Sequence, residues 1–359
     1  MKIEKNYNLS KLNTFGISAK AKFFAEVKSE EDLKKLFTSS VFKENQKFFL
    51  GGGSNILFTK DFDGIVVKIS MLGKVAVKET EETIWLEVGA GENWHDLVAY
   101  AVSKNWGGIE NLALIPGTVG AAPIQNIAAY GQNFSEVFEY LDAFNVETGK
   151  VERFDESKCE FGYRSSIFKN KLKGKYIILK IVIKLAKNPH IETSYYQIGI
   201  TRDSIKEELK KVATPPYTIA DVFNAVVNIR KRKLPDPIST PTIGSFFLNS
   251  IVSREKYEEL KQKVSELQCY PTDQLHYKKA NDSSLHKEGF VKIATGRLLQ
   301  ELGWLGKWEG NVGIHDKHAL VVVTNGKATG EEVVRFAKKV QESYLKRYGI
   351  PLEFEVNLI

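Results

Sequence analysis

The chain contains 359 residues, of which 43% are hydrophobic and 26% charged. These proportions are typical of a globular protein, and the length predicts two or three domains whose cores need no disulfide bonds. The longest apolar stretch, residues 176–185, is interrupted by two lysines and is far shorter than the ~20 residues that span a bilayer. We therefore expect no membrane segment, no secretory signal and, with only two cysteines, a cytoplasmic location.

The net charge is +7, from 51 basic and 44 acidic residues. A lysine-rich solvated surface explains this excess, and so does attraction to an anionic small molecule. Nucleic acid is a poorer explanation, because acidic residues are scattered among the basic ones. Only residues 230–233 form an uninterrupted basic run, and this run lies at the expected C-terminus of a helix, where cations are favourable.

The first hundred residues predict short strands and helices. Ser29 is the expected N-cap of one helix, and Asn93 is the expected N-cap of another that continues to Lys104. Strands are expected at 48–50, 65–69 and 85–88. The first of these strands leads into Gly51-Gly52-Gly53-Ser54-Asn55, and the third ends at a second glycine cluster, 89–91.

Residues 111–131 are apolar, but their prolines and glycines exclude an uninterrupted helix, and they show no alternation typical of a strand. The backbone N–H and C=O groups of a buried irregular segment need hydrogen-bond partners. A well-packed core loop would supply them. We favour the alternative, that these groups bind a large cofactor.

Hairpins and longer helices are expected in the rest of the chain, which indicates an α+β architecture with a boundary near residues 214–216. The expected elements are a hairpin over 141–151, a buried strand over 176–185, and helices over 219–232, after Ser253 and from the capping box Thr329-x-x-Glu332 towards Tyr348. The last segment, 352–358, alternates apolar and polar residues. The pattern alone places its polar face, which includes Glu355, in solvent.

Three motifs are candidates for chemistry. The glycine loop 51–55 lets backbone approach a phosphate, although three glycines also suit a simple turn. Arg164, in Phe161-Gly162-Tyr163-Arg164, suits a carboxylate or phosphate, or alternatively stacks on Tyr163 at the surface. Ser245, in Gly244-Ser245-Phe246-Phe247-Leu248-Asn249, is either a proton donor in a dry site or a turn serine. No metal site is expected, because the pair His315 and His318 lacks further ligands nearby.

Taken together, these motifs resemble the UDP-N-acetylenolpyruvoylglucosamine reductase family, also called UDP-N-acetylmuramate dehydrogenase. The resemblance runs in order from residue 13 to Glu355. It rests on NTFG at 13–16, GGGSN at 51–55, GAGENWHDLV at 89–98, the whole of 111–131, FGYRSS at 161–166, KLPDP at 233–237 and GSFFLN at 244–249. Residues 128–131 and the long segment 165–200 are similar to the subtype in which a tyrosine loop covers the substrate.

The resemblance implies two α+β subdomains that bind FAD non-covalently, similar to the PCMH and vanillyl-alcohol-oxidase fold, and a third α+β domain that binds substrate. The expected divisions are 1–70, 71–213 and 214–349, with 350–359 returning to the active site. The implied reaction reduces UDP-N-acetylglucosamine enolpyruvate to UDP-N-acetylmuramate with NADPH, for peptidoglycan synthesis. No nucleic acid or membrane partner is implied, and a monomer is expected.

Site residues are implied by the same motifs. Ser245 matches the residue that protonates C2 of the substrate, Arg164 the arginine that polarises its carboxylate, and Glu355 the glutamate that assists. The expected substrate contacts are Tyr130, Tyr163, Tyr195, Lys233 and Asn249. The expected FAD contacts are Gly51, Gly52, Gly53, Ser54, Asn55, Gly117, Thr118, Gly120, Ala121 and Ile127.

Some positions depart from the family pattern. Glu301 stands where a glutamine is expected, Leu248 where a lysine is common, and Phe354 where a proline is usual, while Tyr196 is an alternative to Tyr195. Two other functions are considered. Another FAD enzyme, such as a sugar or lactone oxidase, often carries a histidine for covalent flavin, which residues 51–55 lack. A nucleic-acid-binding protein would use the basic run 230–233.

Overall fold

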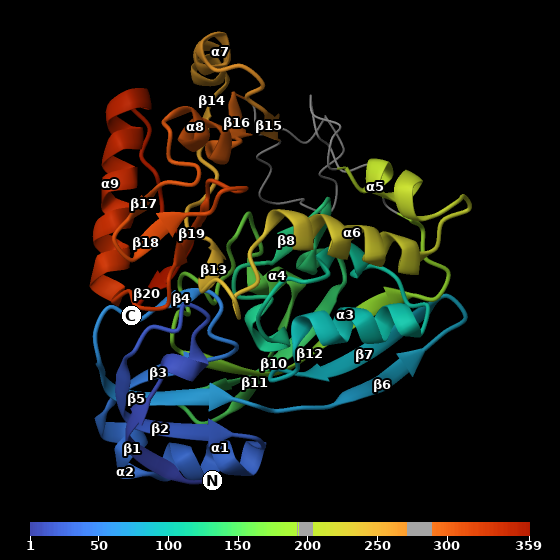
Figure 1. Cartoon of the computed structure of the whole chain (residues 1–359). Helices are drawn as coiled ribbons and strands as arrows, with labels where there is room; N and C mark the ends of the chain where they lie inside the picture. Colours follow the sequence, from blue (N-terminus) through green and yellow to red (C-terminus); the bar gives the residue numbers. More distant parts are fainter. Residues whose placement is uncertain (192, 194–203, 271–288) are drawn as a thin grey trace.

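The computed structural model describes residues 1–191, 193, 204–270 and 289–359. The N-terminal part is a four-stranded sheet with two short helices (Figure 1). In sheet order the strands are β1 (Ile3–Asn8), β2 (Lys20–Val27), β5 (Phe62–Ile69) and β3 (Gln46–Leu50), and the helices are α1 (Glu30–Thr38) and α2 (Ser40–Glu44). Strand β5 pairs in parallel with both β2 and β3.

Strand β5 is buried on both faces, which explains its continuous apolar run. Ile65 and Val67 belong to one hydrophobic core, whereas Val66 belongs to a second. A strand inside a parallel set is typically unbroken in its apolar character because helices or loops cover both faces. This strand therefore connects the two cores of the protein.

The second sheet is antiparallel and confirms the predicted hairpin and buried strand. In sheet order its strands are β11 (Val151–Asp155), β10 (Phe138–Asn145), β12 (Tyr176–Ala186), β7 (Thr83–Gly89) and β6 (Lys74–Glu79). Helices α3 (Trp94–Ser103) and α6 (Ile219–Lys233) lie over this sheet in Figure 1. Their apolar faces, represented by Leu97 and Val226, belong to the same core as the sheet.

The C-terminal part adds two small sheets beside a long helix. The first contains β13 (Thr242–Ser245), β19 (Val321–Thr324), β18 (Val312–Ile314) and β17 (Trp308–Glu309), and the second contains β14 (Ile251–Ser253), β16 (Phe290–Ile293) and β15 (Cys269–Tyr270). The described helices here are α7 (Arg254–Lys263), α8 (Thr295–Glu301) and α9 (Gly330–Tyr348), while α4 (Glu156–Cys159) and α5 (Ile205–Val212) lie earlier in the chain. No helix in the described ranges has the length and apolar character needed to cross a bilayer.

The predicted helix caps are confirmed. Ser29 Oγ accepts a hydrogen bond from Asp32 N at 3.2 Å, and Asn93 Oδ1 accepts one from Asp96 N at 3.1 Å. Ser253 Oγ accepts one from Lys256 N, and the capping box predicted at the start of α9 is present. Capping depends only on neighbouring residues, which is why the sequence alone predicts it well.

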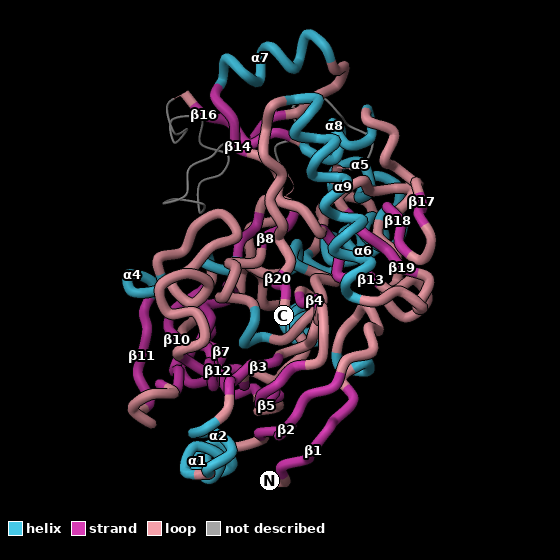
Figure 2. The backbone as a smooth tube through the Cα atoms, turned by 90° about the vertical axis from the view of Figure 1, so that its left-hand side faces the viewer, coloured by secondary structure: helices cyan, strands magenta, loops and turns pink. Residues whose placement is uncertain are grey.

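The C-terminal segment differs in part from its prediction. Only Asn357–Leu358 form a strand, β20, which pairs in parallel with β4 (Ile56–Leu57). Leu352 and Val356 are buried as expected, whereas Leu358 is 41% exposed. In Figure 1 and Figure 2 the C-terminus lies beside β4 and away from the N-terminus.

Two leucines offer a matched test of the core. Leu97, in α3, is fully buried, whereas Leu72 is 71% exposed. We expect Leu97→Ala to lower the free energy of unfolding by about 2–5 kcal/mol, because it leaves a cavity in the core. Leu72→Ala should change it by less than about 0.5 kcal/mol. Urea denaturation followed by tryptophan fluorescence measures both, and equal effects would contradict the core assignment.

Candidate active site

The glycine loop 51–55 packs directly against the apolar segment 111–131. A Cβ atom at Gly52 would lie 2.8 Å from Gly117 Cα, and one at Gly51 would lie 2.6 Å from Thr118 Oγ1. Cβ atoms do not approach so closely, so Gly52 is needed for contact with the backbone of Gly117, and Gly51 for contact with the Thr118 side chain, rather than for a turn alone. The prediction that these two segments act together is consistent with this contact.

The second glycine cluster, 89–91, meets the same segment from another side. Gly120 N donates a hydrogen bond to Ala90 O at 2.8 Å, and Val119 N donates one to Glu92 O at 2.8 Å. Ile127 O accepts a bond from Phe134 N at 2.9 Å. Neighbouring loops therefore satisfy part of the backbone of 111–131. These bonds agree with the packed core loop, while the ligand-binding loop stays a prediction.

Several donors at this junction are available to a ligand. The N–H groups of Gly52, Gly53 and Ser54 donate to no acceptor among the described residues. Thr14 N donates to Gly53 O at 3.2 Å, while the buried Thr14 hydroxyl has no hydrogen-bond partner within the described part of the chain. Successive free N–H groups in a glycine turn form a concave anion site.

Arg164 occupies a tight turn. Gly162 and Ser165 pair with each other through both backbone hydrogen bonds, 3.0 and 3.3 Å, so Tyr163 and Arg164 form a two-residue turn. Arg164 has a φ of +51°, a left-handed conformation that favours glycine. A non-glycine residue held there costs roughly 1–3 kcal/mol and is often found at functional sites.

The Arg164 side chain is held by groups from separate segments. Its Nε lies 3.0 Å from Glu355 Oε1, and its Nη2 donates to Ala128 O at 3.2 Å. The side chains of Arg164 and Glu355 are only 23% and 12% exposed. The guanidinium also lies near the Tyr163 ring, 5.9 Å from its centroid, but it is not on the surface. Placing Glu355 in solvent, as its sequence pattern suggested, is therefore wrong, whereas its assignment beside the arginine agrees with this geometry.

Ser245 belongs to the same neighbourhood because the segment that follows it pairs with the C-terminal segment. Glu355 N donates to Phe246 O at 2.8 Å, and Leu248 N donates to Glu353 O at 2.9 Å. The side-chain amide of Asn55 bonds Glu355 O at 3.3 Å and Gln125 Oε1 at 2.8 Å. The structure thus brings together the glycine loop, the 111–131 segment, the GSFFLN motif and the C-terminal segment.

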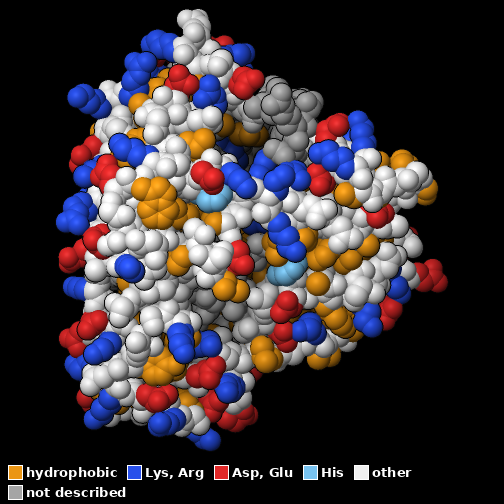
Figure 3. Space-filling view, in the orientation of Figure 1, with side chains coloured by type: hydrophobic (Ala, Val, Ile, Leu, Met, Phe, Trp, Pro, Cys, Tyr) orange, Lys and Arg blue, Asp and Glu red, His pale blue; other side chains and the backbone are white. Residues whose placement is uncertain are grey.

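Basic side chains surround this meeting point. Lys292 Nζ lies 4.1 Å from the centroid of the Tyr163 ring. Burial lowers the pKa of Lys292, the Arg164 charge lowers it further, and Tyr163 and Glu355 oppose both effects. Arg230 Nη2 donates to Leu114 O at 3.2 Å, and burial lowers the pKa of its guanidinium. Figure 3 shows Lys and Arg side chains gathered near the middle of one face, next to histidine.

His318 lies among these cations in its neutral form. Burial lowers the pKa of His318 to about 4, and the charges of Lys233, His315 and Arg230 act in the same direction. Its Nδ1 accepts a hydrogen bond from Leu320 N at 3.3 Å, so the neutral ring carries its proton on Nε2. Arg230 and Lys233 lie one turn apart on α6, which places both on the same side of that helix.

Other predicted residues have different surroundings. Asn249 Oδ1 accepts a bond from Thr295 N at 3.2 Å, so this side chain also supports the start of α8. Tyr130 adopts a φ of +48°, and its carbonyl accepts a bond from Asn111 Nδ2. Glu301 is exposed and pairs with Arg297 at 3.1 Å. Tyr195 and the alternative Tyr196 lie outside the described residues.

Sequence reasoning missed Lys292, Gln125 and the part played by Arg230. Lys292 could have been noticed because it interrupts the short apolar run Phe290–Ile293. Arg230 was noticed within a basic run, but the helix dipole was a sufficient explanation for that run. Nothing in the sequence distinguishes Gln125 from other polar residues of its loop.

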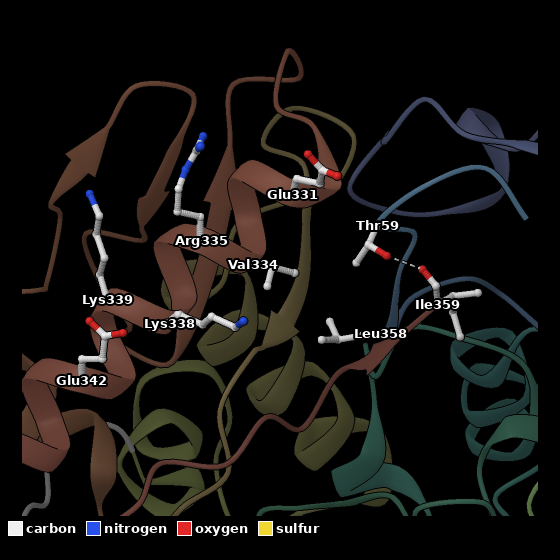
Figure 4. A pocket seen from close by; sticks show the side chains of 9 residues that line it. All are labelled: Thr59, Glu331, Val334, Arg335, Lys338, Lys339, Glu342, Leu358 and Ile359. Carbon is white, nitrogen blue, oxygen red and sulfur yellow. Dashed lines mark hydrogen bonds between the residues drawn. The ribbon is translucent and has the colours of Figure 1, made fainter.

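A separate surface hollow of about 690 Å³ lies between α9 and the C-terminal strand (Figure 4). Its lining includes Thr59, which bonds Ile359 O, and basic side chains of α9 such as Lys338. None of the site residues predicted from the sequence lines it. This hollow is therefore distinct from the meeting point of the motifs.

Comparison with known proteins identifies the family. One family model, an FAD binding domain, matches residues 21–155, and another, the C-terminal domain of UDP-N-acetylenolpyruvoylglucosamine reductase, matches residues 236–359. The UDP-N-acetylenolpyruvoylglucosamine reductases of Flavobacterium johnsoniae and Amoebophilus asiaticus are 41% and 42% identical over 360 and 359 residues, covering all of both chains. That of Burkholderia orbicola is 38% identical, covering 98% of this chain and 95% of the other.

Solved structures agree at the level of the fold. UDP-N-acetylenolpyruvylglucosamine reductase from Thermus caldophilus has a TM-score of 0.66 over 100% of this chain and 99% of that one, at 22% identity. A solvent-stable cholesterol oxidase has a TM-score of 0.54 over 99% and 86%, at 10% identity. The predicted α+β fold, a PCMH-like FAD-binding part followed by a C-terminal domain, is thus confirmed. Relatives of about 40% identity match throughout, and the chain therefore belongs to the UDP-N-acetylenolpyruvoylglucosamine reductase family.

Proposed function

We propose that this protein reduces UDP-N-acetylglucosamine enolpyruvate to UDP-N-acetylmuramate, with FAD as cofactor and NADPH as electron donor, in the synthesis of peptidoglycan. Family membership supports the reaction. The observation that carries the residue assignment is the Arg164–Glu355 ion pair, 3.0 Å long, beside the segment that contains Ser245.

The residues present fit a bound dinucleotide such as FAD. The glycine loop approaches Gly117 so closely that a Cβ atom would fill the gap, and three consecutive N–H groups of this loop have no described acceptor. The buried Thr14 hydroxyl next to the loop is also without a described partner. We propose that residues 51–55 and 117–121 bind the diphosphate through backbone groups, and that Ile127 packs nearby.

FAD, when bound, accepts a hydride from NADPH and supplies one to C3 of the enolpyruvyl group. Hydride addition leaves negative charge on C2 and on the adjoining carboxylate. We propose that the Arg164 guanidinium stabilises this charge, because a preorganised cation acts strongly where water is scarce. Glu355 orients the guanidinium, and the Ser245 hydroxyl delivers a proton to C2.

The surrounding cations suit the rest of this substrate. A nucleoside diphosphate with a carboxylate carries several negative charges, and Arg230, Lys233 and Lys292 supply positive charge from two different elements. Burial lowers the pKa values of Arg230 and Lys292 because it disfavours their charged forms. A bound anion would stabilise both charged forms. Tyr130, Tyr163, Tyr195 and Asn249 complete the proposed substrate contacts, with Tyr195 in a proposed tyrosine loop.

The remaining expectations are part of this proposal. We propose that the chain acts as a cytoplasmic monomer without a nucleic acid or membrane partner. We also propose the divisions 1–70, 71–213 and 214–349. The first division is supported because the first sheet uses residues between 3 and 69 and the second uses residues between 74 and 186. Helix α6, at the start of the third part, packs into the core of the second sheet.

The direct test is anaerobic stopped-flow absorbance of the purified flavoprotein. NADPH should bleach the flavin band, and UDP-N-acetylglucosamine enolpyruvate should then restore it in a single turnover. Restoration by oxygen but not by the enolpyruvyl sugar would contradict the proposal and would indicate an oxidase.

Gly52→Ala tests the cofactor loop. The added Cβ would collide with Gly117, so the loop must move and lose one or more hydrogen bonds to phosphate. Each such bond contributes about 1.5–3 kcal/mol, so FAD affinity should fall at least about tenfold. Equilibrium dialysis against FAD measures this change. Gly296→Ala is the control, because a Cβ there meets only Leu320 at an ordinary 3.6 Å.

Ser245→Ala tests the proton donor. The variant should be reduced by NADPH at the normal rate, but its reoxidation by the enolpyruvyl substrate should slow by about 10²–10⁴-fold. Ser239→Ala, at an exposed position before the same strand, is the matched control. Normal reoxidation of Ser245→Ala would exclude the serine as the donor.

A further inference from the structure

We propose that Lys169 is a positioning residue that fixes the Arg164 backbone and so aims its guanidinium at Glu355. This inference rests on the proposed function, because it assigns a task to a residue outside the catalytic group described above. Its first support is a direct contact: Lys169 Nζ donates a hydrogen bond to Arg164 O at 2.8 Å.

The contact acts at the strained residue of the turn. Arg164 has a φ of +51°, which side-chain-bearing residues rarely adopt. The carbonyl of Arg164 points to the Lys169 ammonium, so that a charged donor stabilises this orientation of the peptide. Without that donor, the left-handed conformation of Arg164 would lose one of the contacts that stabilise it.

Lys169 is itself held close to the turn. Ser166 Oγ donates to Ile124 O at 2.6 Å, and Lys169 N donates to Ser166 O at 3.2 Å. The stretch from the turn to Lys169 is thus attached to the 111–131 segment. This attachment brings the lysine back over the turn instead of leaving it in solvent.

The charges around Lys169 support the same role. Burial lowers the pKa of Lys169, Arg164 and Lys173 act in the same direction, and Glu355 and Glu353 oppose them. Lys169 is therefore electrostatically coupled to both members of the Arg164–Glu355 pair. The Lys169 ammonium is partly buried, and a charge in such a position is stable only where specific contacts favour it.

A positioning role differs in its consequences from a purely structural one. The guanidinium is needed when negative charge develops on the enolpyruvyl carboxylate, and not when NADPH reduces the flavin. A displacement of about 1 Å at such a group costs roughly 100-fold in rate. Loss of Lys169 should therefore affect one half-reaction far more than the other.

The experiment compares the two half-reactions in Lys169→Met, Lys169→Arg and Lys173→Met. In Lys169→Met we expect flavin reduction by NADPH within about twofold of wild type, and reoxidation by the enolpyruvyl substrate slowed by about 10–100-fold. Lys169→Arg keeps the charge and the donor and should recover most of the rate. Lys173→Met removes an equal charge from an exposed neighbour and should behave as wild type.

Two further measurements separate positioning from folding. Thermal unfolding shows whether each variant is intact, and a crystal structure of Lys169→Met should show the Arg164–Glu355 contact longer than 3.0 Å. Unchanged reoxidation in Lys169→Met, or an equal loss in both half-reactions, would overturn the inference. Failure of the wild type to be reoxidised by the enolpyruvyl sugar would instead overturn the proposed function.

Discussion

The ion pair between Arg164 and Glu355 connects parts of the protein that are distant in the sequence, and the arrangement of the site depends on it. Glu355 is held by its backbone to Phe246, and through Asn55 to the glycine loop, 300 residues earlier in the chain. Arg164 is held to the 111–131 segment through Ala128 O. One contact between two side chains therefore joins the turn at residues 162–165 to the C-terminal segment.

The site also contains buried positive charge, and burial lowers the pKa values of Arg230 and Lys292. Arg230 bonds a backbone carbonyl, and Lys292 lies over an aromatic ring. Partly buried cations weaken the folded protein, because each loses hydration. Binding of a polyanionic substrate reverses this effect. The same groups that reduce stability in the free protein can thus add to affinity for a nucleoside diphosphate, a common relation between stability and function.

Much of the fold could be predicted because its signals are local. The caps at Ser29 and Asn93 depend on residues three positions away, and the hairpin of 141–151 depends on its turn and its alternation. The glycine loop was also recognised as special. The sequence could not show, however, that Gly52 approaches Gly117 closely, because the two residues belong to loops that are distant in the sequence. The order of strands β11-β10-β12-β7-β6 likewise depends on long-range pairing that no short pattern encodes.

The site was predicted mainly through resemblance, and the C-terminal segment shows why residues alone were insufficient. Alternation correctly separated Leu352 and Val356 from Glu353 and Glu355, because period-two geometry fixes which residues share a face. It could not decide what each face meets. Glu353 is exposed, whereas the side chain of Glu355 on the same face is only 12% exposed, because Arg164, from a turn between α4 and β12, lies beside Glu355. Lys292 illustrates the converse. A charged residue in an apolar strand is unexpected from the pattern, and its position is explained only by Tyr163, which is distant in the sequence and lies beside it in the fold. Local patterns thus define the faces of this protein, and the partners of its charged groups follow only from tertiary packing.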